Sequence, residues 1–327
     1  MTIQDPYAEV EYNFFPKKKA TVIQAPFSGG QGKGGVEFGP EKMIEFGMLS
    51  NIEELNWDYT VEDPLSELDL ITLKQDSKDV YNNCKRPKMV SDCCKLIYNS
   101  VSKAHENKTL PVTIGGDHSI GMSTILAFVN AHPDGGILWI DAHADINTPS
   151  TTESGNLHGC PVAFAMGLEE ETWPPQFDWI KEIKHKVRKD QIAYIGLRDV
   201  DNGEKKILRE LGIAAYSMYH VDKYGINEVV RMALEKVNPT GKAPIHVSYD
   251  VDAMDPMFVV ATGTPVRGGL SLREGLFIVE EVAAQGNLCG LDIVEVNPSL
   301  ATQDGHVADT VNAGLSILRC ALGETIL

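Results

Sequence analysis

The chain has 327 residues, a formal net charge of −17 at pH 7 and a pI near 4.9. This acidity excludes a basic surface for nucleic acid, because the one basic cluster, Lys17–Lys19, is too short to build one. No stretch approaches the roughly 18 apolar residues of a membrane-spanning helix, so no contact with a membrane interior is expected.

The composition predicts one globular unit. Hydrophobic residues make up 43% of the chain, and no linker, internal repeat or low-complexity tract divides it, so we expect residues 1–327 to form a single domain. The first thirteen residues lack an apolar leader. Cysteines stand at 84, 93, 94, 160, 289 and 320, without the paired spacing of a zinc knuckle or a disulfide framework. We expect a soluble, cytoplasmic protein with reduced, mostly buried thiols.

Short apolar runs alternate with helical stretches along the chain, which is typical of a mostly parallel sheet covered by helices on both faces. Six runs have the apolar, β-branched character of fully buried strands. They are Ala20–Gln24, Leu110–Ile114, Ile137–Ile140, Ile192–Ile195, Ile245–Tyr249 and Leu288–Val294. The sequence therefore predicts an α/β fold with three α/β/α layers around a mostly parallel central sheet.

Helices are expected between these strands. In 90–105, apolar residues recur at three- and four-residue intervals, as on one face of a helix. Ser271 and Glu274 have capping-box spacing and open a helix predicted over 272–284, which gives Glu274 a structural role. The polar segment 57–88 shows no clean period, and we interpret it as an irregular surface excursion.

Candidate metal ligands follow three of the predicted strands directly. Asp141, His143 and Asp145 stand at every second position after one strand, and Asp250 and Asp252 follow another. A third strand leads into the glycine-rich segment that ends with His118. Each motif alone is often a turn, a cap or a hydrogen-bonded histidine. However, the carboxyl ends of parallel strands line one crevice, so we expect these groups to converge there.

Four carboxylates within a few ångströms of one another would raise one another's pKa values strongly unless cations countered them. Two divalent cations would supply that charge. A mixed imidazole and carboxylate set without thiolate favours Mn²⁺ over Zn²⁺ or Mg²⁺ and leaves Co²⁺ and Ni²⁺ open. The pattern therefore predicts a hydrolase with two metal ions.

Three weaker signals receive structural interpretations. The loop Gly29–Gly35 lacks the spacing of a phosphate-binding loop, and we expect it near the mouth of the site. Cys160 stands two residues after His158, and we interpret it as a small buried filler because a metal-activated nucleophile would be available. Arg198 is the one basic residue within the motif set, which is too little for the phosphate clamp of a two-metal phosphatase, so we expect it to pair structurally.

The motifs together resemble the arginases of the manganese ureohydrolase family, most of all the fungal ones. The resemblance covers nearly the whole chain. It rests on Ala25-Pro26-Phe27-Ser28, Gly115-Gly116-Asp117-His118-Ser119, Asp141-Ala142-His143-Ala144-Asp145, Ser154-Gly155-Asn156-Leu157-His158-Gly159, Gly196-Leu197-Arg198-Asp199-Val200-Asp201, Ser248-Tyr249-Asp250-Val251-Asp252, Ala261-Thr262-Gly263-Thr264-Pro265 and Glu295-Val296-Asn297-Pro298. It implies an arginase/deacetylase-like fold and a homotrimer that acts in arginine metabolism, as in the urea cycle.

By this resemblance, two Mn²⁺ ions bind per subunit and share two carboxylates. One ion would be held by His118, Asp141, Asp145 and Asp250, and the other by Asp141, His143, Asp250 and Asp252. The implied reaction is hydrolysis of L-arginine to L-ornithine and urea by a hydroxide that bridges the ions.

The resemblance also implies the catalytic residues. Glu295 would hold the guanidinium group and stabilise the tetrahedral intermediate. Asp145 would pass the proton of the nucleophile to the departing amine, and His158 would shuttle protons to solvent.

Substrate choice is expected to depend on polar groups that read the α-carboxylate and α-amine of arginine. The matching residues are Asn147, Thr152, Ser154, Asn156, Asp201 and Glu204. Hydrolysis of agmatine or guanidinobutyrate, and a catalytically silent paralogue, remain as alternatives. The chain departs from the family pattern at Ala253 and at Val259-Val260, which puts the geometry of that loop in doubt.

Overall fold

The computed structural model describes residues 9–76 and 78–325. A sheet of eight strands forms its centre, and every recorded pairing within this sheet is parallel. The strands are β1 (Lys19–Ala25), β2 (Asp58–Glu62), β5 (Leu110–Gly115), β6 (Gly136–Ile140), β7 (Ile192–Leu197), β8 (Ala214–Ser217), β9 (Ile245–Asp250) and β10 (Leu288–Val294). Their spatial order is β2-β1-β5-β10-β9-β6-β7-β8. All six predicted strands are confirmed.

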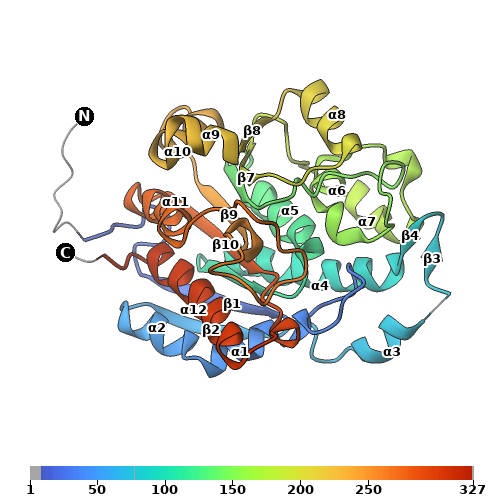
Figure 1. Cartoon of the computed structure of the whole chain (residues 1–327), viewed down its shortest axis with the longest axis horizontal. Helices are drawn as coiled ribbons and strands as arrows, with labels where there is room; N and C mark the ends of the chain where they lie inside the picture. The colour runs from blue at the N-terminus through green and yellow to red at the C-terminus, as the bar shows by residue number, and fades with distance from the viewer. Residues whose placement is uncertain (1–8, 77, 326–327) are drawn as a thin grey trace.

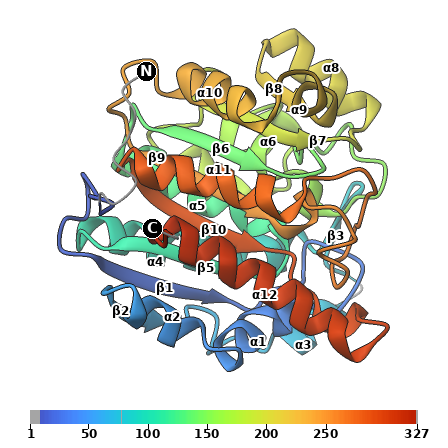
Figure 2. The ribbon, with the colours of Figure 1, turned by 60° about the vertical axis from the view of Figure 1, so that its left-hand side comes forward.

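Two layers of helices cover the sheet (Figures 1 and 2). On one face lie α4 (Pro87–Glu106), α5 (Gly121–Ala131) and α6 (Pro161–Met166). The other face carries α1 (Gly39–Glu45), α2 (Met48–Glu54), α10 (Ile226–Val237), α11 (Leu272–Ala284) and α12 (Asp304–Ala321). The predicted three-layer α/β/α architecture is therefore confirmed.

Shorter elements complete the described chain. They are the helices α3 (Leu70–Gln75), α7 (Asp178–Lys181), α8 (Asn202–Leu211) and α9 (Met218–Tyr224), the hairpin strands β3 (Val80–Tyr81) and β4 (Cys84–Lys85), and the 3₁₀ turns η1 (Val36–Phe38), η2 (His118–Ile120), η3 (Leu157–Gly159), η4 (Glu170–Thr172), η5 (Pro175–Phe177), η6 (Val251–Ala253) and η7 (Pro298–Leu300).

Burial explains why the central strands were readable from the sequence. Every residue of β5, β6, β7, β9 and β10 is buried, because helices cover both faces of the sheet. The helix predictions also hold. Helix α4 contains the predicted 90–105 segment, and α11 has the predicted bounds. At its start, the Ser271 hydroxyl accepts from the Glu274 amide, and the Glu274 carboxylate accepts from the Ser271 amide at 2.8 Å.

The prediction that 57–88 is irregular is wrong. Strand β2 extends the sheet beside β1, with Lys19 paired to Asp58, and α3 and the β3–β4 hairpin follow. All the side chains of β2 are exposed or half-buried, because it is an edge strand. Burial therefore imposed no apolar pattern on its sequence. Strand β8, at the opposite edge, was missed for the same reason, since all four of its residues are only half-buried.

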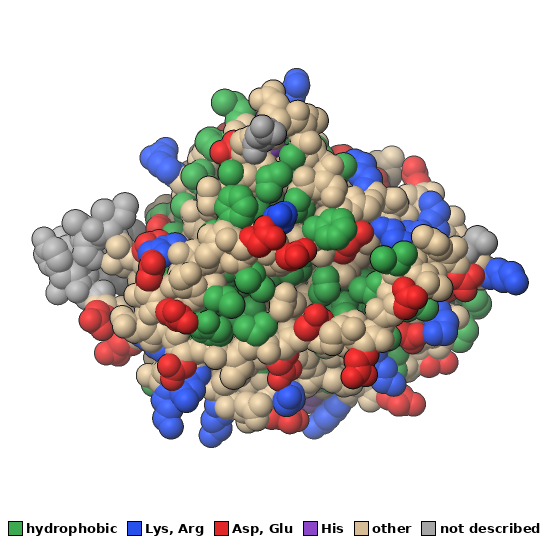
Figure 3. Space-filling model, turned by 90° about the horizontal axis from the view of Figure 1, so that it is seen from below, with side chains coloured by type: hydrophobic (Ala, Val, Ile, Leu, Met, Phe, Trp, Pro, Cys, Tyr) green, Lys and Arg blue, Asp and Glu red, His purple; other side chains and the backbone are tan. Residues whose placement is uncertain are grey.

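One face of the molecule mixes side chains of every kind (Figure 3). Hydrophobic groups lie among acidic and basic ones, and the basic side chains are scattered over this face rather than gathered.

Within the described residues, no helix has both the length and the apolar character needed to span a membrane. All six cysteines are free and buried, as predicted.

Candidate functional site

The candidate ligands lie at the carboxyl ends of neighbouring strands. In space, β5, β10, β9 and β6 are consecutive, although they are far apart in sequence. His118 follows β5, Glu295 follows β10, Asp250 ends β9 and Asp141 follows β6. All these strands run in the same direction, so their ends share one edge of the sheet, where open α/β folds bind ligands. The predicted convergence is confirmed.

Local hydrogen bonds fix the loops that carry these residues. Asp141 Oδ1 accepts from the His143 amide at 2.7 Å, and Asp250 Oδ1 accepts from the Asp252 amide at 2.7 Å. Both aspartates therefore cap a turn and also face the site. Asp145 and Glu295 have φ values of 49° and 65°, a left-handed conformation that costs energy for residues other than glycine. Such strain is maintained where the surrounding structure holds a side chain in a required position.

His118 lies against three carboxylates. Its Nδ1 atom is 3.1 Å from Asp141 Oδ2, 3.3 Å from Asp145 Oδ2 and 3.4 Å from Asp250 Oδ2. One nitrogen cannot satisfy three oxygens at once, so the arrangement matches ligands that surround one cation. The buried groups His118, Asp141 and Asp145 meet the spacing of a metal site.

A second set of ligands adjoins the first and shares Asp141. His143 Nδ1 lies 3.3 Å from Asp141 Oδ1 and 3.3 Å from Asp252 Oδ2. These three residues also have the spacing of a metal site. Because the two oxygens of Asp141 face different imidazoles, this carboxylate stands between two adjacent positions for a cation.

The pKa values of these carboxylates reflect the crowding of negative charge. Burial and then the charge of Asp141 raise the pKa of Asp145 to about 6. Burial, with the charges of Asp252 and Asp141, raises the pKa of Asp250 well above its usual range. The pKa of Asp141 is instead lowered, because hydrogen bonds and charge from His118 and His143 overcome the effect of its burial.

The donor chemistry fits a pair of divalent cations. Oxygen ligands predominate, imidazole completes the set, and no cysteine belongs to either group of ligands. This combination suits Mn²⁺ better than it suits softer ions. Cations would also remove the electrostatic cost of these buried carboxylates.

A buried polar network orients His118, and sequence reasoning missed it. Ser248 Oγ donates to Asp292 Oδ2 at 3.0 Å and lies 3.0 Å from His118 Nε2. Because the serine proton is committed to Asp292, its oxygen accepts from the His118 Nε2–H group. The lone pair of Nδ1 then faces the carboxylates, as a metal ligand requires. An acid inside an otherwise apolar strand was the available signal for Asp292.

Trp139 and Thr264 also contact candidate metal ligands, and neither contact was predicted. The Trp139 ring stacks on His118 with centroids 4.0 Å apart, and its Nε1 donates to Asp141 Oδ2 at 3.0 Å. Thr264 Oγ1 donates to Asp252 Oδ2 at 2.9 Å. These contacts hold each ligand in one rotamer, which favours a preformed site.

The glycine-rich loop lies beside the site, as predicted. Gln31 Nε2 donates to Glu295 Oε2 at 2.7 Å, the Gly30 amide donates to Asp117 Oδ2 at 2.7 Å, and the His158 amide donates to Gly30. Glu295 Oε1 also accepts from the His118 amide at 3.0 Å. The loop therefore positions Glu295, and Gln31 is a further site residue that no local motif indicated.

His158 lies within reach of Glu295. The two side chains are 3.8 Å apart from Nδ1 to Oε1. Burial alone would lower the pKa of His158, but Glu295, together with the charges of Asp145 and Asp117, raises it above its usual value. A raised pKa favours the protonated imidazole, which is the form that can donate a proton.

All six predicted substrate residues line one cavity of about 240 Å³, together with the candidate metal ligands His143, Asp145 and Asp250. Its lining consists of His143, Asp145, Asn147, Thr152, Ser154, Asn156, His158, Gly159, Asp199, Asp201, Glu204, Asp250 and Thr264. Asp199 is an acidic group at this cavity that sequence reasoning did not select. The lining thus combines carboxylates and imidazoles with hydroxyl and amide groups.

Several of these polar residues also make local contacts. Thr152 Oγ1 and Ser154 Oγ accept from backbone amides of their own turn at 3.1 and 3.2 Å. Asn147 Nδ2 donates to Asp201 Oδ2 at 2.9 Å. The carboxylate of Glu204 accepts from the Asp201 amide at 2.9 Å and caps α8, so Glu204 has a structural role besides lining the cavity. Burial raises the pKa of Glu204 to about 7.

Arg198 and Cys160 are structural, as predicted. The Arg198 guanidinium donates to backbone carbonyls, including those of Asp252 at 2.7 Å and Ala253 at 3.0 Å. It therefore secures the loop that carries a candidate ligand and includes the unusual Ala253. Cys160 is fully buried, and burial raises the pKa of its thiol well above the usual value, which leaves no reactive thiolate.

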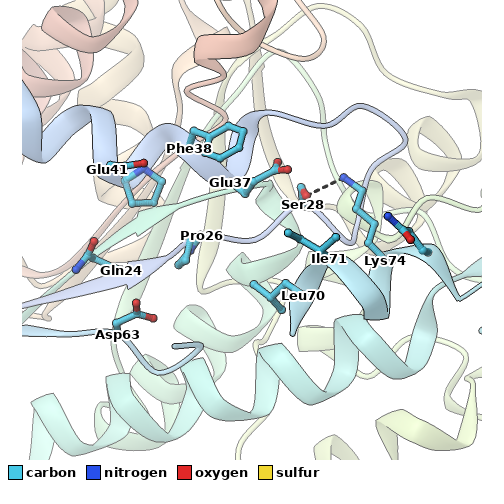
Figure 4. A pocket seen from close by; sticks show the side chains of 12 residues that line it. Gln24, Pro26, Ser28, Glu37, Phe38, Glu41, Asp63, Leu70, Ile71 and Lys74 are labelled. Atoms are coloured by element: carbon cyan, nitrogen blue, oxygen red, sulfur yellow. Dashed lines mark hydrogen bonds between the residues drawn. The ribbon is translucent and has the colours of Figure 1, made fainter. Parts of the chain in front are cut away.

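A second cavity, of about 570 Å³, lies between η1, α1 and α3 (Figure 4). Lys74 reaches across it and donates to Ser28 Oγ at 2.7 Å, while Phe38, Leu70 and Ile71 supply apolar lining. None of the candidate metal ligands lines this cavity. Size alone therefore does not identify the functional site.

Comparisons with known proteins agree with this geometry. The model of the family described as "Arginase family" matches residues 18–323. Arginase of Eremothecium gossypii is 57% identical over 97% of this chain and 78% of its own length, and arginase of Saccharomyces cerevisiae is 52% identical over 97% and 98%. The crystal structure of Entamoeba histolytica arginase in complex with L-ornithine is similar, with a TM-score of 0.82, 30% identity and coverage of 96% and 100%. The chain therefore belongs to the arginase family, the hydrolases that cleave the guanidino carbon–nitrogen bond of arginine.

Proposed function

We propose that the cavity described above hydrolyses L-arginine to L-ornithine and urea with the aid of two Mn²⁺ ions. The observation that carries the proposal is the position of Asp141, whose Oδ2 faces His118 at 3.1 Å while its Oδ1 faces His143 at 3.3 Å. This shared carboxylate lies next to a cavity with polar lining. The similar Entamoeba histolytica arginase was crystallised with L-ornithine, which supports L-ornithine as the product here.

His118, Asp141, Asp145 and Asp250 would hold one ion, and Asp141, His143, Asp250 and Asp252 the other. When bound, the two ions would supply positive charge to the carboxylates and hydroxide at neutral pH. The protein would contribute the orientation of the ligands, through the networks around His118 and Asp252.

Glu295 would position the guanidinium group of the substrate. Its carboxylate already accepts one hydrogen bond from Gln31 and one from the His118 amide, and each oxygen retains a lone pair. Fixed in this way, it can accept from the planar guanidinium without reorganisation. A fixed negative charge also favours the cationic substrate in the transition state.

Asp145 and His158 would move the protons. Asp145 would accept the proton of the attacking nucleophile and pass it to the δ-nitrogen of the departing ornithine, because an unprotonated amine of this kind leaves slowly. His158, at the same cavity, would restore the proton balance with solvent.

The rim of the cavity would distinguish arginine from its analogues. Asp201 is an exposed carboxylate suited to the α-ammonium group, and Asn147, Thr152 and Ser154 can donate to the α-carboxylate. The buried Oδ1 atom of Asn156 has no hydrogen-bond partner among the described residues, and this acceptor would suit a donor such as the α-ammonium group. A substrate without the α-groups would leave these atoms unpaired.

Urea release from arginine, agmatine and guanidinobutyrate by the Mn²⁺-loaded protein tests this assignment. We expect kcat/KM to favour arginine by roughly 10²-fold or more, because a site that pairs with polar substrate groups rejects analogues without them. Asp201→Ala should narrow the gap in kcat/KM between arginine and guanidinobutyrate, which lacks the α-amine and is one carbon shorter. Faster turnover of agmatine than of arginine would overturn the assignment of arginine as the substrate. If none of the three compounds is hydrolysed, the chain would instead be a catalytically silent paralogue.

We also propose that residues 1–327 act as one domain in a cytoplasmic homotrimer. The six free, buried thiols support a reducing compartment, and the trimer follows from the resemblance to arginases. Sedimentation velocity would measure the assembly. A mass three times that of the chain is expected, and a stable monomer would contradict the trimer.

A further inference from the structure

Three side chains with metal-binding atoms meet at the amino-terminal edge of the sheet, away from the site described above. His105 lies in the last turn of α4, His132 follows the end of α5, and Cys289 is the second residue of β10. Their ligand atoms all lie within 4.8 Å of one another. Strand β10 separates Cys289 from Glu295, and six residues of strand span roughly 20 Å.

The contacts within this cluster leave ligand atoms unused. Cys289 Sγ lies 3.2 Å from His132 Nε2, and the rings of His105 and His132 have centroids 5.0 Å apart at 79°. Both ring nitrogens of His105 are buried without a hydrogen-bond partner. A buried, unpaired imidazole is costly, so a ligand that engages one of these nitrogens would stabilise the arrangement.

The protonation states suit metal binding by the two histidines. Burial, with the nearby His132 and His246, lowers the pKa of His105 to about 3. Burial also lowers the pKa of His132. Both imidazoles are therefore neutral at pH 7, and each retains a lone pair. Burial raises the pKa of the Cys289 thiol, so this group keeps its proton until a metal ion displaces it.

The cluster adjoins a cavity of about 400 Å³ that His105 and His132 help to line. Tyr98, Ser102 and Glu106 form part of the same wall. The cavity places open space beside the two histidine side chains, and a water molecule there could serve as the fourth ligand that three protein ligands require in tetrahedral geometry.

We propose that His105, His132 and Cys289 bind one Zn²⁺ ion, separate from the two ions of the arginine site. Binding breaks the Sγ–H bond of Cys289, releases that proton to solvent and forms the sulfur–zinc bond, with no change of oxidation state. Thiolate and imidazole favour Zn²⁺ over Mn²⁺, whereas the carboxylate-rich site has the opposite character. The ion ties the ends of α4 and α5 to the start of β10 and thereby stabilises the fold.

Co²⁺ titration of the full-length, Mn²⁺-loaded protein tests the proposal, because Co²⁺ adopts zinc geometry and a cobalt–thiolate bond absorbs in the near ultraviolet. We expect one such absorption band that saturates near one Co²⁺ per chain and disappears when Zn²⁺ is added. Cys289→Ala should remove the band and keep the hydrolysis of arginine. Cys160→Ala is the matched control, since Cys160 is also a buried, free thiol, and it should keep the band.

His105→Asn provides a second variant that keeps the thiol. It should weaken Co²⁺ binding at least tenfold and abolish the rise in thermal midpoint that Zn²⁺ gives the wild-type chain. The absence of a band in the wild-type chain, or a band that survives Cys289→Ala, would overturn the zinc site. Either result would leave the hydrolysis of arginine untouched, so the two proposals fail separately.

Discussion

Replacing Asp141 by asparagine is expected to lower kcat/KM for arginine by roughly 10³-fold or more. The two oxygens of Asp141 face the imidazoles of His118 and His143, and an amide can offer a ligand oxygen on one side alone. Losing the shared ligand should remove at least one ion. A metal ion lowers the activation free energy of such a reaction by several kcal/mol, and about 1.4 kcal/mol corresponds to a tenfold change in rate. Urea release and bound manganese, measured on the same sample, check this result.

The fold of the Asp141→Asn variant should survive without metal. Asparagine removes a negative charge that His118 and His143 stabilise in the metal-free protein, so the thermal midpoint of the metal-free variant should fall below that of the metal-free wild type. Adding Mn²⁺ should raise the thermal midpoint of the variant by less than it raises that of the wild type. Asp134→Asn is the matched control, because Asp134 is exposed just before the other end of β6. A variant with two tightly bound Mn²⁺ ions and full activity would refute the shared-ligand assignment.

Replacing His158 by alanine is expected to reduce kcat by roughly 10²-fold to 10⁴-fold, the usual contribution of a general acid or base. Bound manganese should not change, because His158 lies 3.8 Å from Glu295 and belongs to neither group of ligands. The pH profile of kcat, measured from pH 6 to 10, should no longer show the ionisation of His158. Added imidazole should restore part of the rate, since it fits the space that the substitution opens.

His185→Ala serves as the control for this substitution. His185 is half-buried between α7 and β7, and its replacement should leave the pH profile as it is. If His158→Ala turns over arginine at the wild-type rate across the whole pH range, His158 carries no proton in the reaction. If the variant loses manganese instead, His158 helps to hold the metal ligands in place and does not transfer protons.

The candidate metal ligands were predictable because they lie at, or within five residues of, the carboxyl end of a buried strand. Burial on both faces imposes an apolar run on such a strand, and the polar residue that ends the run marks the edge of the sheet. His118 and Asp250 are therefore identifiable even though 132 positions separate them in sequence. The parallel direction of the strands brings them to one place.

The supporting residues could not be predicted in the same way. Gln31 reaches Glu295 across 264 positions, and Ser248 reaches His118 across 130, so no local spacing records either contact. Edge strands were missed for a different reason. Strand β2 is exposed or half-buried throughout, and a strand with little burial has no apolar pattern to read.

Glu204 shows that one residue can cap a helix and also line a cavity. The resemblance to arginases selected it as a substrate residue, and the structure also makes it the cap of α8, where it accepts from the Asp201 amide. A capping box was recognised at Ser271, but the same spacing at Asp201 was assigned to substrate alone. Helix capping and ligand binding use the same polar side chains, and sequence alone does not separate them.

Anomalous diffraction at the manganese edge, from crystals of the Mn²⁺-loaded protein, would show whether Asp141 lies between two metal ions. We expect two peaks on either side of the Asp141 carboxylate, one toward His118 and Asp145 and the other toward His143 and Asp252. A single peak, or peaks away from these side chains, would contradict this arrangement.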